Sequence, residues 1–203
     1  PEIDIADANA VHSVVALRRP DIVVNVAAYT TVDRAEAEPE LAFAVNATGA
    51  GNVADAAASF GVPVIQISTD YVFPGDLAGA RREDDETGPA TAYGRSKLAG
   101  ETAVSQANRR HLTLRTSWVF SPVGQNFVKT MLRLAAERDR ISVVADQVGN
   151  PTYAGEIANA IFLCARRALS PGFAGWGTYH FAGPLAMSWA NLARLAFEQS
   201  VRH

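Results

Sequence analysis

The sequence predicts an α/β protein built on a doubly wound, mainly parallel sheet. Two observations predict this class. Short runs rich in β-branched residues alternate along the chain with stretches of helical periodicity. The runs contain few polar residues, as expected for strands that helices cover on both faces. Because ligands in this class bind at the carboxyl ends of the strands, the residues after each run are the first candidates for a functional site.

The predicted strands are short. Residues 22–26 are mostly β-branched and come directly after Pro20 and Asp21, which favours a buried strand. Two further runs have the same character, and two are less regular. In chain order, the expected strands are 22–26, 62–68, 112–116, 141–144 and 178–181.

The predicted helices lie between these runs. One begins after Asp7 and ends at Arg19, because Pro20 cannot continue it. A long one starts near Pro39, a first-turn residue, and stops before Gly61. The remaining helices are expected at about 91–108, 125–138, 154–169 and 188–199.

The composition suits a globular protein with one good core. The chain has 203 residues, of which 48% are hydrophobic and 19% are charged, and its formal net charge is −3. The basic residues form no stripe with interleaved aromatics, which argues against a nucleic-acid partner. No apolar run approaches ~18 residues, and the first residues do not read as a signal peptide, so we expect no membrane association and a cytoplasmic location.

Neither cysteine nor histidine predicts a metal site. The single cysteine, Cys164, lies in an apolar helical stretch, where a packed thiol is expected rather than a nucleophile. The four histidines never stand at the spacing of metal ligands. We therefore expect no catalytic metal.

The first residues of the chain lack the pattern with which a dinucleotide-binding sheet begins. Such a sheet begins with a strand, a glycine-rich turn and a helix. The nearest candidate, Gly49-Ala50-Gly51, lies inside a helical pattern instead. We therefore expect that the first βα unit is missing. These residues alone are then expected to bind a dinucleotide poorly, because they lack the phosphate cradle at a helix N-terminus.

The central chemical signal is Tyr93, followed four residues later by Lys97. This spacing puts the phenol and the ammonium on one helical face, one turn apart. The ordinary pKa of tyrosine, ~10, is too high for useful proton transfer at neutral pH, and a nearby ammonium is expected to lower it. The pair then acts as a general acid that protonates a carbonyl oxygen as hydride reaches its carbon. Alone the pair is weak evidence, because such spacing occurs by chance on many exposed helices.

A second signal stands at the end of the 62–68 strand, which runs into Ser68, Thr69 and Asp70. A hydroxyl at a carboxyl end can hydrogen-bond a substrate carbonyl and hold it against the tyrosine. The alternative is ordinary turn chemistry, in which Ser, Thr and Asp are common. The segment between Thr69 and Tyr93 leaves room for a loop across the site. Together the two signals favour the catalytic interpretation.

Six ordered blocks resemble the dTDP-4-dehydrorhamnose reductase family of extended short-chain dehydrogenases/reductases. The resemblance runs from Asp4 to about Phe197. The blocks are residues 25–33, 68–73, 93–101, 115–120, 126–132 and 146–152. The resemblance implies a Rossmann-like fold, truncated at the N-terminus, with part of a smaller substrate-binding lobe.

The same resemblance implies two domains. Residues 1–120 would form the dinucleotide-binding domain, without its first βα unit. Residues 121–203 would be mixed, with substrate-lobe segments plus helices and a strand that return to the nucleotide-binding domain.

The resemblance also implies a reaction. The family's activity is hydride transfer from NADPH or NADH to the 4-keto group of dTDP-4-dehydro-L-rhamnose, which gives dTDP-L-rhamnose. A dTDP-sugar is then the partner molecule, and a homodimer is left open. The choice between NADH and NADPH is also open, because the residue that reads the ribose 2′ position follows the second strand of the fold, before residue 1.

The resemblance assigns site residues position by position. The catalytic residues are Thr69, Tyr93 and Lys97. The cofactor-binding residues are Asp4, Ile5, Ala27, Ala28, Tyr29, Thr30, Ile67, Tyr93 and Lys97. The substrate-binding residues are Thr69, Asp70, Tyr71, Trp118, Gln147, Pro151 and Thr152, and no metal ligand is implied. Asn46 resembles a buried helix asparagine that bonds the backbone near the site. For Trp118, the alternative is an ordinary core aromatic at a strand end.

Two alternatives come from the same superfamily. A sugar-nucleotide 4,6-dehydratase follows its threonine with Asp-Glu, because the elimination of water needs an acid and a base beyond the tyrosine. Here Asp70 is followed by Tyr71. A 4-epimerase needs the same tyrosine and lysine, and only the blocks at 70–73 and 115–120 speak against it.

A third alternative belongs to another class of protein. A non-catalytic regulatory subunit resembling that of methionine adenosyltransferase would work by binding a partner. The presence of Thr69, Tyr93, Lys97 and Trp118 favours the enzyme.

Overall fold

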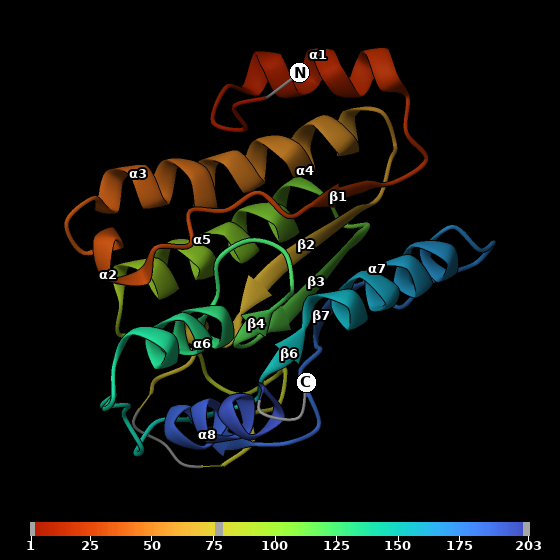
Figure 1. The fold of residues 1–203 in the computed structure, drawn as a ribbon. Helices are drawn as coiled ribbons and strands as arrows, with labels where there is room; N and C mark the ends of the chain where they lie inside the picture. Colours follow the sequence, from red (N-terminus) through yellow and green to blue (C-terminus); the bar gives the residue numbers. More distant parts are fainter. Residues whose placement is uncertain (1–2, 76–78, 201–203) are drawn as a thin grey trace. The chain divides into compact units, whose positions relative to one another are not determined.

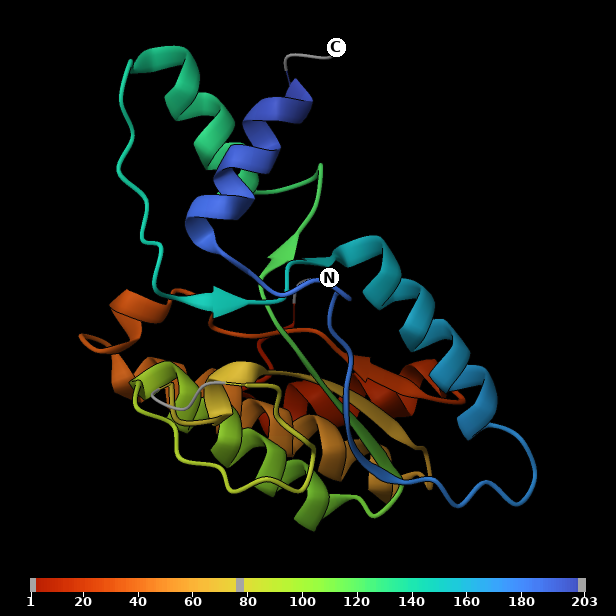
Figure 2. The same ribbon diagram turned by 90° about the horizontal axis from the view of Figure 1, so that it is seen from below.

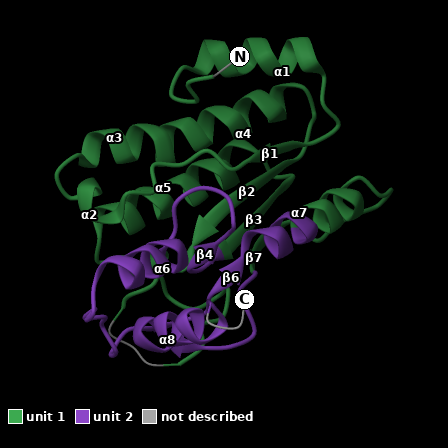
Figure 3. Ribbon diagram, in the orientation of Figure 1, with its two compact units in different colours: residues 1–115, 161–180 green, residues 116–160, 181–203 purple. Residues whose placement is uncertain are grey.

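The computed structural model describes residues 3–75 and 79–200, which divide into two compact units (Figure 3). Unit 1 contains residues 1–115 and 161–180, and unit 2 contains residues 116–160 and 181–203. The roles predicted for residues 1–120 and 121–203 stay predictions, because compactness alone assigns no role.

Unit 1 is built on a four-stranded sheet in the order β1-β2-β3-β7. Its strands are β1 (Val23–Asn25), β2 (Val64–Thr69), β3 (His111–Thr116) and β7 (Gly177–His180). β1 pairs with β2 in parallel, and β3 pairs with β7 in parallel. Parallel neighbours need crossover connections, which explains the alternation of strands with helices. Four of the predicted strands are confirmed, with ends that differ by one or two residues.

Helices cover both faces of this sheet. α1 (Ala8–Arg18) lies along α4 (Ala50–Ser59), and α4 lies along α5 (Ala92–Ala107) (Figure 1). α7 (Ala154–Ala168), of which residues 161–168 belong to unit 1, runs along the other face (Figure 2). Consecutive residues of β2 pack against the helices on opposite faces of the sheet, because side chains alternate along a strand. Val64 packs with α1, α4 and α5, whereas Ile65 packs with α7, and both are fully buried.

The ends of two predicted helices follow the local signals. Asp7 caps α1, because its Oδ1 accepts the N–H groups of Asn9 and Ala10 at 2.9 and 3.1 Å. α1 ends at Arg18, and Arg19, which follows it directly before Pro20, has a left-handed φ of 45°. α4 ends before Gly61, whose φ of 65° suits the residue that follows a helix.

The long predicted helix is present, but its middle is a π-helix. It consists of α3 (Pro39–Phe43), the π segment η1 (Ala44–Gly49) and α4. Such wide turns often occur at functional sites, and this one contains the buried Asn46. Two short helices, α2 (Val32–Ala35) and η2 (Asp70–Val72), were not predicted.

Unit 2 contains two helices and two small sheets. The helices are α6 (Phe127–Glu137) and α8 (Trp189–Ser200), and the Phe127 and Trp189 rings lie 4.4 Å apart. β4 (Val119–Phe120) pairs with β6 (Thr152–Tyr153) in parallel, and β5 (Val148–Gly149) pairs with β8 (Met187–Ser188) antiparallel. These two-residue strands are too short to produce a periodic pattern in the sequence.

The predicted strand at 141–144 is wrong. These residues have irregular backbone, although their burial alternates as it would in a half-buried strand. Val144 O accepts one N–H group, from Ala190 at 3.0 Å, and no ladder forms. A strand needs a neighbour along its length, and an apolar pattern cannot supply one. Within 3–75 and 79–200, no helix is both long and apolar enough to span a bilayer.

Candidate active site

Tyr93 and Lys97 lie on one face of α5, as their spacing predicts. Thr91 caps this helix, because its Oγ1 accepts the Gly94 N–H at 3.0 Å. Gly94 lets the first turn approach η2, since a Cβ atom there would overlap Tyr71 O. Tyr93 is 9% exposed and Lys97 is 4% exposed. Both side chains are therefore held in a nearly dry site by a regular helix.

Thr69, the last residue of β2, lies beside this face. The Thr69 side chain is close enough to the Tyr93 phenol to lower the pKa of that phenol by hydrogen bonding. Thr69 Oγ1 also accepts the Tyr71 N–H at 3.2 Å and donates to Asp70 Oδ1 at 3.1 Å. The structure thus brings together the phenol and the strand-end hydroxyl on which the predicted site depends.

Burial raises the pKa of Tyr93 to about 12. The hydrogen bond with Thr69 lowers this pKa, whereas Asp70 and Tyr71 raise it further. The expected net lowering by Lys97 is therefore wrong, because desolvation of the phenol is the larger effect. A phenol with so high a pKa keeps its proton at neutral pH but is a weak acid, so proton transfer from it requires stabilisation of the phenolate that forms.

Lys97 is fixed by the neighbouring strand. Its ammonium group donates to Ile67 O at 2.7 Å, so the predicted cofactor-binding residue Ile67 orients the lysine through its backbone. Burial lowers the pKa of Lys97 to about 8, and the charge of Glu101 acts in the opposite direction. An ammonium carries three donors, and Ile67 takes one of them. The others can serve hydroxyl groups of a ligand.

Asp70 and Tyr71 lie in η2, next to Thr69. Burial raises the pKa of Asp70, and the hydrogen bond from Thr69 opposes this effect. The Tyr71 ring meets the Tyr93 ring edge-on, with 5.5 Å between centroids and 78° between planes. These two predicted substrate residues therefore lie at the same end of the sheet as Thr69 and Tyr93.

The turn after β1 contains four of the predicted cofactor contacts, Ala27, Ala28, Tyr29 and Thr30. Asn46 holds this turn: its Oδ1 accepts the Tyr29 N–H at 2.8 Å, and its Nδ2 donates to Tyr29 O at 3.0 Å. The same Nδ2 donates to Ser96 Oγ, on α5, at 2.9 Å. Asn46 therefore ties the turn to the helix of Tyr93, and its predicted supporting role is confirmed.

This turn presents backbone to a ligand. Ala27 and Thr30 are exposed and Ala28 is half-buried, so small side chains leave the main chain accessible. Asn25, buried at the end of β1, accepts the Ala27 N–H at 3.1 Å and donates to Gln66 Oε1 at 2.8 Å. A firmly held turn of small residues at the strand ends fits a dinucleotide lying across them.

Asp4 and Ile5 precede α1. Asp4 is exposed, and its Oδ1 accepts the Ala6 N–H at 2.9 Å. Ile5 packs against the core of α1 and α4, so closely that a Cβ atom at Gly49 would lie 2.6 Å from it. Ile5 therefore has a packing role, and its predicted cofactor role stays a prediction.

Trp118, a predicted substrate residue, belongs to unit 2. Its backbone is left-handed, with a φ of 45°. Its ring stacks on the Trp189 ring, with 3.5 Å between centroids and 8° between planes. Gly149 lies against the same ring, which would overlap any Cβ atom at that position. Trp118 is thus held rigidly in an unusual conformation, which is costly for a residue with a bulky side chain.

The remaining predicted substrate residues also belong to unit 2. Gln147 is exposed and Pro151 is half-buried. Thr152 is buried, and its Oγ1 donates to Asn150 O at 3.0 Å and accepts the Gly183 N–H at 3.1 Å. The buried Thr152 therefore stabilises its own loop through hydrogen bonds, whereas the side chain of Gln147 is exposed to solvent.

Known proteins resemble this chain along nearly its whole length. A family model described as "RmlD substrate binding domain" matches residues 1–203. A dTDP-4-dehydrorhamnose reductase of Sinorhizobium fredii is 52% identical over 198 residues, which cover 97% of this chain and 67% of that protein. The Escherichia coli dTDP-4-dehydrorhamnose reductase is 45% identical over 97% of this chain and 66% of its own length.

A solved structure shows the same likeness in three dimensions. The dTDP-4-dehydrorhamnose reductase from Bacillus anthracis, in complex with NADP, is 41% identical and has a TM-score of 0.93, over 98% of this chain and 69% of that one. The chain belongs to the dTDP-4-dehydrorhamnose reductase family. It spans about two thirds of the length of these relatives.

The comparisons confirm the predicted family and the Rossmann-like α/β fold. They also bear out the expected class of enzyme, since the relatives are reductases. The NADP in the Bacillus anthracis structure agrees with the expected nicotinamide cofactor. The roles of individual site residues stay predictions, because the comparisons assign none.

Two buried residues near the site of this reductase family member, Glu101 and Arg115, were not predicted as site residues. Ser68 Oγ donates to Glu101 Oε1 at 2.5 Å, and Arg115 forms an ion pair with Glu101 at 2.7 Å. A signal for Glu101 was available, because it stands four residues after Lys97 on the same helical face. A signal for Arg115 was its charge inside the predicted strand 112–116, whose other residues are leucines and threonines.

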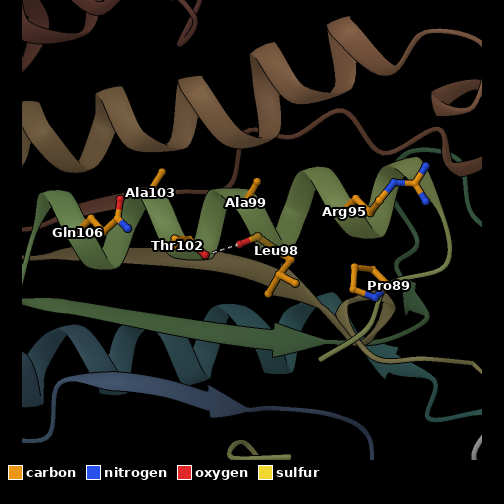
Figure 4. Close-up of a pocket in the computed structure, with 7 residues that line it drawn as sticks. All are labelled: Pro89, Arg95, Leu98, Ala99, Thr102, Ala103 and Gln106. Carbon is orange, nitrogen blue, oxygen red and sulfur yellow. Dashed lines mark hydrogen bonds between the residues drawn. The ribbon is translucent and has the colours of Figure 1, made fainter. Parts of the chain in front are cut away.

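Two hollows in unit 1 lie apart from Tyr93. A groove of about 470 Å³ follows the opposite face of α5 (Figure 4). Its lining consists of Pro89, Arg95, Leu98, Ala99, Thr102, Ala103 and Gln106. A second hollow of about 260 Å³ is lined by Pro74, Arg81, Asp85, Glu86, Thr87 and Gly88. Neither is lined by Thr69, Tyr93 or Lys97. In the described ranges, no group of three or more His, Cys, Asp or Glu is placed to hold a metal ion.

Proposed function

We propose that the full-length protein reduces the 4-keto group of dTDP-4-dehydro-L-rhamnose to give dTDP-L-rhamnose, with NADPH or NADH as cofactor. The observation that carries this proposal is the contact between Tyr93 and Thr69 at the carboxyl end of β2, with Lys97 buried one turn along α5. Family membership supports the same reaction.

Tyr93 is the proton donor in this proposal. Reduction of a ketone places negative charge on the carbonyl oxygen, which must then receive a proton. The Tyr93 phenol, whose pKa is raised to about 12, is protonated at neutral pH, and a positive charge beside it is needed to stabilise the phenolate once the proton is given. The bond from phenol oxygen to hydrogen breaks as the bond from hydrogen to the sugar oxygen forms.

Thr69 positions the sugar carbonyl. Its oxygen is held by the Tyr71 N–H, and its proton points to Asp70 Oδ1 before a substrate arrives. To bond the carbonyl oxygen, the hydroxyl turns this proton from Asp70 to the sugar. In the proposed complex the carbonyl oxygen lies between Thr69 and Tyr93, and Asp70 and Tyr71 contact the sugar.

Lys97 serves both the cofactor and Tyr93. With one donor on Ile67 O, its ammonium can bond ribose hydroxyls with the others. Its positive charge also favours the phenolate that Tyr93 becomes after proton transfer. When bound, the reduced nicotinamide supplies the hydride that the carbonyl carbon accepts. The turn at 27–30, with Asp4 and Ile5, would hold the remainder of the dinucleotide.

The other parts of the proposal concern the whole protein. Residues 1–120 would carry the dinucleotide, and residues 121–203 would contribute substrate-side segments. Trp118, Gln147, Pro151 and Thr152 would contact the dTDP-sugar. We also propose a cytoplasmic enzyme, since nucleotide sugars are made where their nucleotides are, and a homodimer remains part of the prediction.

A turnover assay tests this function. Full-length protein is mixed with dTDP-4-dehydro-L-rhamnose and NADPH or NADH, and loss of the reduced nicotinamide and the mass of the sugar product are followed. Stoichiometric oxidation with formation of dTDP-L-rhamnose supports the proposal. Changed configuration at C4 without net cofactor consumption would indicate an epimerase, and loss of water from a dTDP-hexose would indicate a dehydratase. Absence of turnover, with co-purification of a methionine adenosyltransferase, would indicate a regulatory subunit.

A further inference from the structure

Glu101 lies one helical turn beyond Lys97, in the interior of unit 1. Its side chain and that of Arg115 are each 8% exposed. Both carboxylate oxygens are bonded: Oε1 accepts from Ser68 Oγ at 2.5 Å and from Arg115 Nε at 3.0 Å, and Oε2 accepts from Arg115 Nη2 at 2.7 Å. A carboxylate with two charged donors and one hydroxyl on it cannot rotate freely. Its negative charge is therefore fixed in place.

Arg115 is itself fixed from the side opposite to Glu101. Its Nη1 donates to Glu83 O at 3.2 Å and lies 3.5 Å from His180 Nε2. The guanidinium lies over the Phe73 ring, 5.0 Å from its centroid. Glu83 in turn accepts the His180 N–H at 3.0 Å. Arg115 therefore links β3, β7 and the loop around Glu83. Its ion pair with Glu101 connects these segments to α5.

The charge of Glu101 acts on Lys97. Removing an ammonium from water disfavours its charged form, and a nearby carboxylate offsets this effect. Glu101 opposes the effect of burial on the Lys97 pKa. The Lys97 ammonium donates to Ile67 O, at the end of β2. The carboxyl group of Asp70, which follows β2, acts on Tyr93.

We propose that Glu101 is a positioning residue of the reductase site, whose carboxylate, fixed by Arg115 and Ser68, keeps the buried Lys97 in its charged form and aligned with the carboxyl end of β2. The importance of Glu101 for catalysis rests on the proposed function, because it is the proposed reduction that requires a charged Lys97. The ion pair with Arg115 then has a role in the site. A buried ion pair alone seldom contributes stability, so stability by itself would not account for the pair.

The test measures the protonation of Lys97 directly. Residues 1–203 contain two lysines, Lys97 and Lys129. In full-length protein labelled with ¹³C,¹⁵N-lysine, the side-chain resonance of Lys97 is assigned by its loss in Lys97→Met and is followed by NMR against pH. Lys129, whose Nζ donates to Pro122 O in unit 2, is the internal control.

Three variants separate charge from structure. Glu101→Gln keeps the shape and removes the charge. Glu101→Gln combined with Arg115→Met removes both charges, so that no buried cation loses its partner, and this double variant is measured if the single one does not fold. Ser68→Ala removes a hydrogen bond to Glu101 and no charge. We expect the Lys97 midpoint to fall by about one pH unit or more in Glu101→Gln, to fall less in the double variant and to fall least in Ser68→Ala, with Lys129 unchanged.

An unchanged or higher Lys97 midpoint in both Glu101 variants overturns the inference. A second readout is the alkaline limb of the activity profile, which we expect to move to lower pH in Glu101→Gln. A loss of activity that is equal at every pH would indicate a structural role alone. If the parent protein does not reduce the dTDP-sugar, the proposed function fails, but the NMR titration still decides whether Glu101 controls the charge of Lys97.

Discussion

At the scale of single residues, the site depends on how burial changes acids and bases. Tyr93 and Lys97 are both nearly inaccessible to water, and burial favours the neutral form of each: it raises the pKa of Tyr93 to about 12 and lowers the pKa of Lys97 to about 8. The phenol is kept protonated, and the ammonium is made easier to deprotonate. The chemistry of the pair is therefore set by its surroundings as much as by its i, i+4 spacing.

Removal of the phenol hydroxyl tests the proton donor. Tyr93→Phe keeps the ring, including its edge-on contact with Tyr71, and removes only the group that gives the proton. We expect kcat to fall by ~10²–10⁴, with the Kd for NADPH nearly unchanged. Steady-state kinetics and a fluorescence titration of NADPH measure the two quantities. Turnover close to that of the parent would remove Tyr93 from this role.

The lowered pKa of Lys97 predicts a pH-dependent stability. Below about pH 8 the ammonium is charged in both the folded and the unfolded chain, and its burial is unfavourable. Between about 8 and the ordinary 10.5, the folded protein has lost this proton and the unfolded chain still binds it. Because the unfolded state then binds more protons, stability rises with pH through this window.

Lys97→Met isolates this effect. We expect the free energy of unfolding of the parent, relative to that of Lys97→Met, to rise by about 2 kcal/mol between pH 7 and about pH 9.5. Urea unfolding of both proteins at several pH values measures the difference, and groups common to both cancel. A difference that stays flat over this range would show that Lys97 is not desolvated in solution.

At the scale of elements, the site depends on the close approach of α5 to the π segment η1. The two meet at Gly100, where a Cβ atom would overlap Asn46 O. The wide π turn places the Asn46 side chain between the turn at Tyr29 and Ser96 on α5. The helix that carries the predicted catalytic pair and the turn predicted to hold the cofactor are thus positioned by one amide.

Gly100→Ala tests this contact. The added methyl group can be accommodated only if α5 moves away from η1, so we expect a loss of about 1–3 kcal/mol in stability, together with weaker binding of NADPH. Gly51→Ala is a matched control on α4, because its Cβ atom would meet only the Ala103 methyl group, at 3.2 Å. The prediction fails if both variants lose the same stability and bind NADPH equally well.

At the scale of the whole molecule, the predicted site residues are shared between the two units. Thr69, Tyr93 and Lys97 belong to unit 1, whereas Trp118 and Thr152 belong to unit 2. Within unit 2, the stack of Trp118 on Trp189 holds the predicted sugar-side residue. Substitutions in unit 2 should therefore affect the sugar nucleotide and spare the cofactor.

Trp189→Ala tests this division. Without its stacking partner, Trp118 loses its fixed orientation, and we expect KM for the dTDP-sugar to rise about tenfold or more, while the Kd for NADPH stays within about twofold. Phe127→Leu is the control, because Phe127 contacts the Trp189 ring and leaves the Trp118 stack intact. An equal effect of Trp189→Ala on both ligands would count against separate roles.

The sequence by itself determined the α/β class, four strands of the main sheet, the long helices and the placing of Tyr93, Lys97 and Thr69 near one another. These depend on local periodicity and on the rule that parallel strands end at one edge. Tertiary structure decided the rest: the π turn at Asn46, the irregular chain at 141–144, the ion pair of Glu101 with Arg115, and the direction of the Tyr93 pKa. Each of these depends on which groups meet across distant parts of the chain and on how far water is excluded there, and neither quantity is encoded in the spacing of residues along a single element.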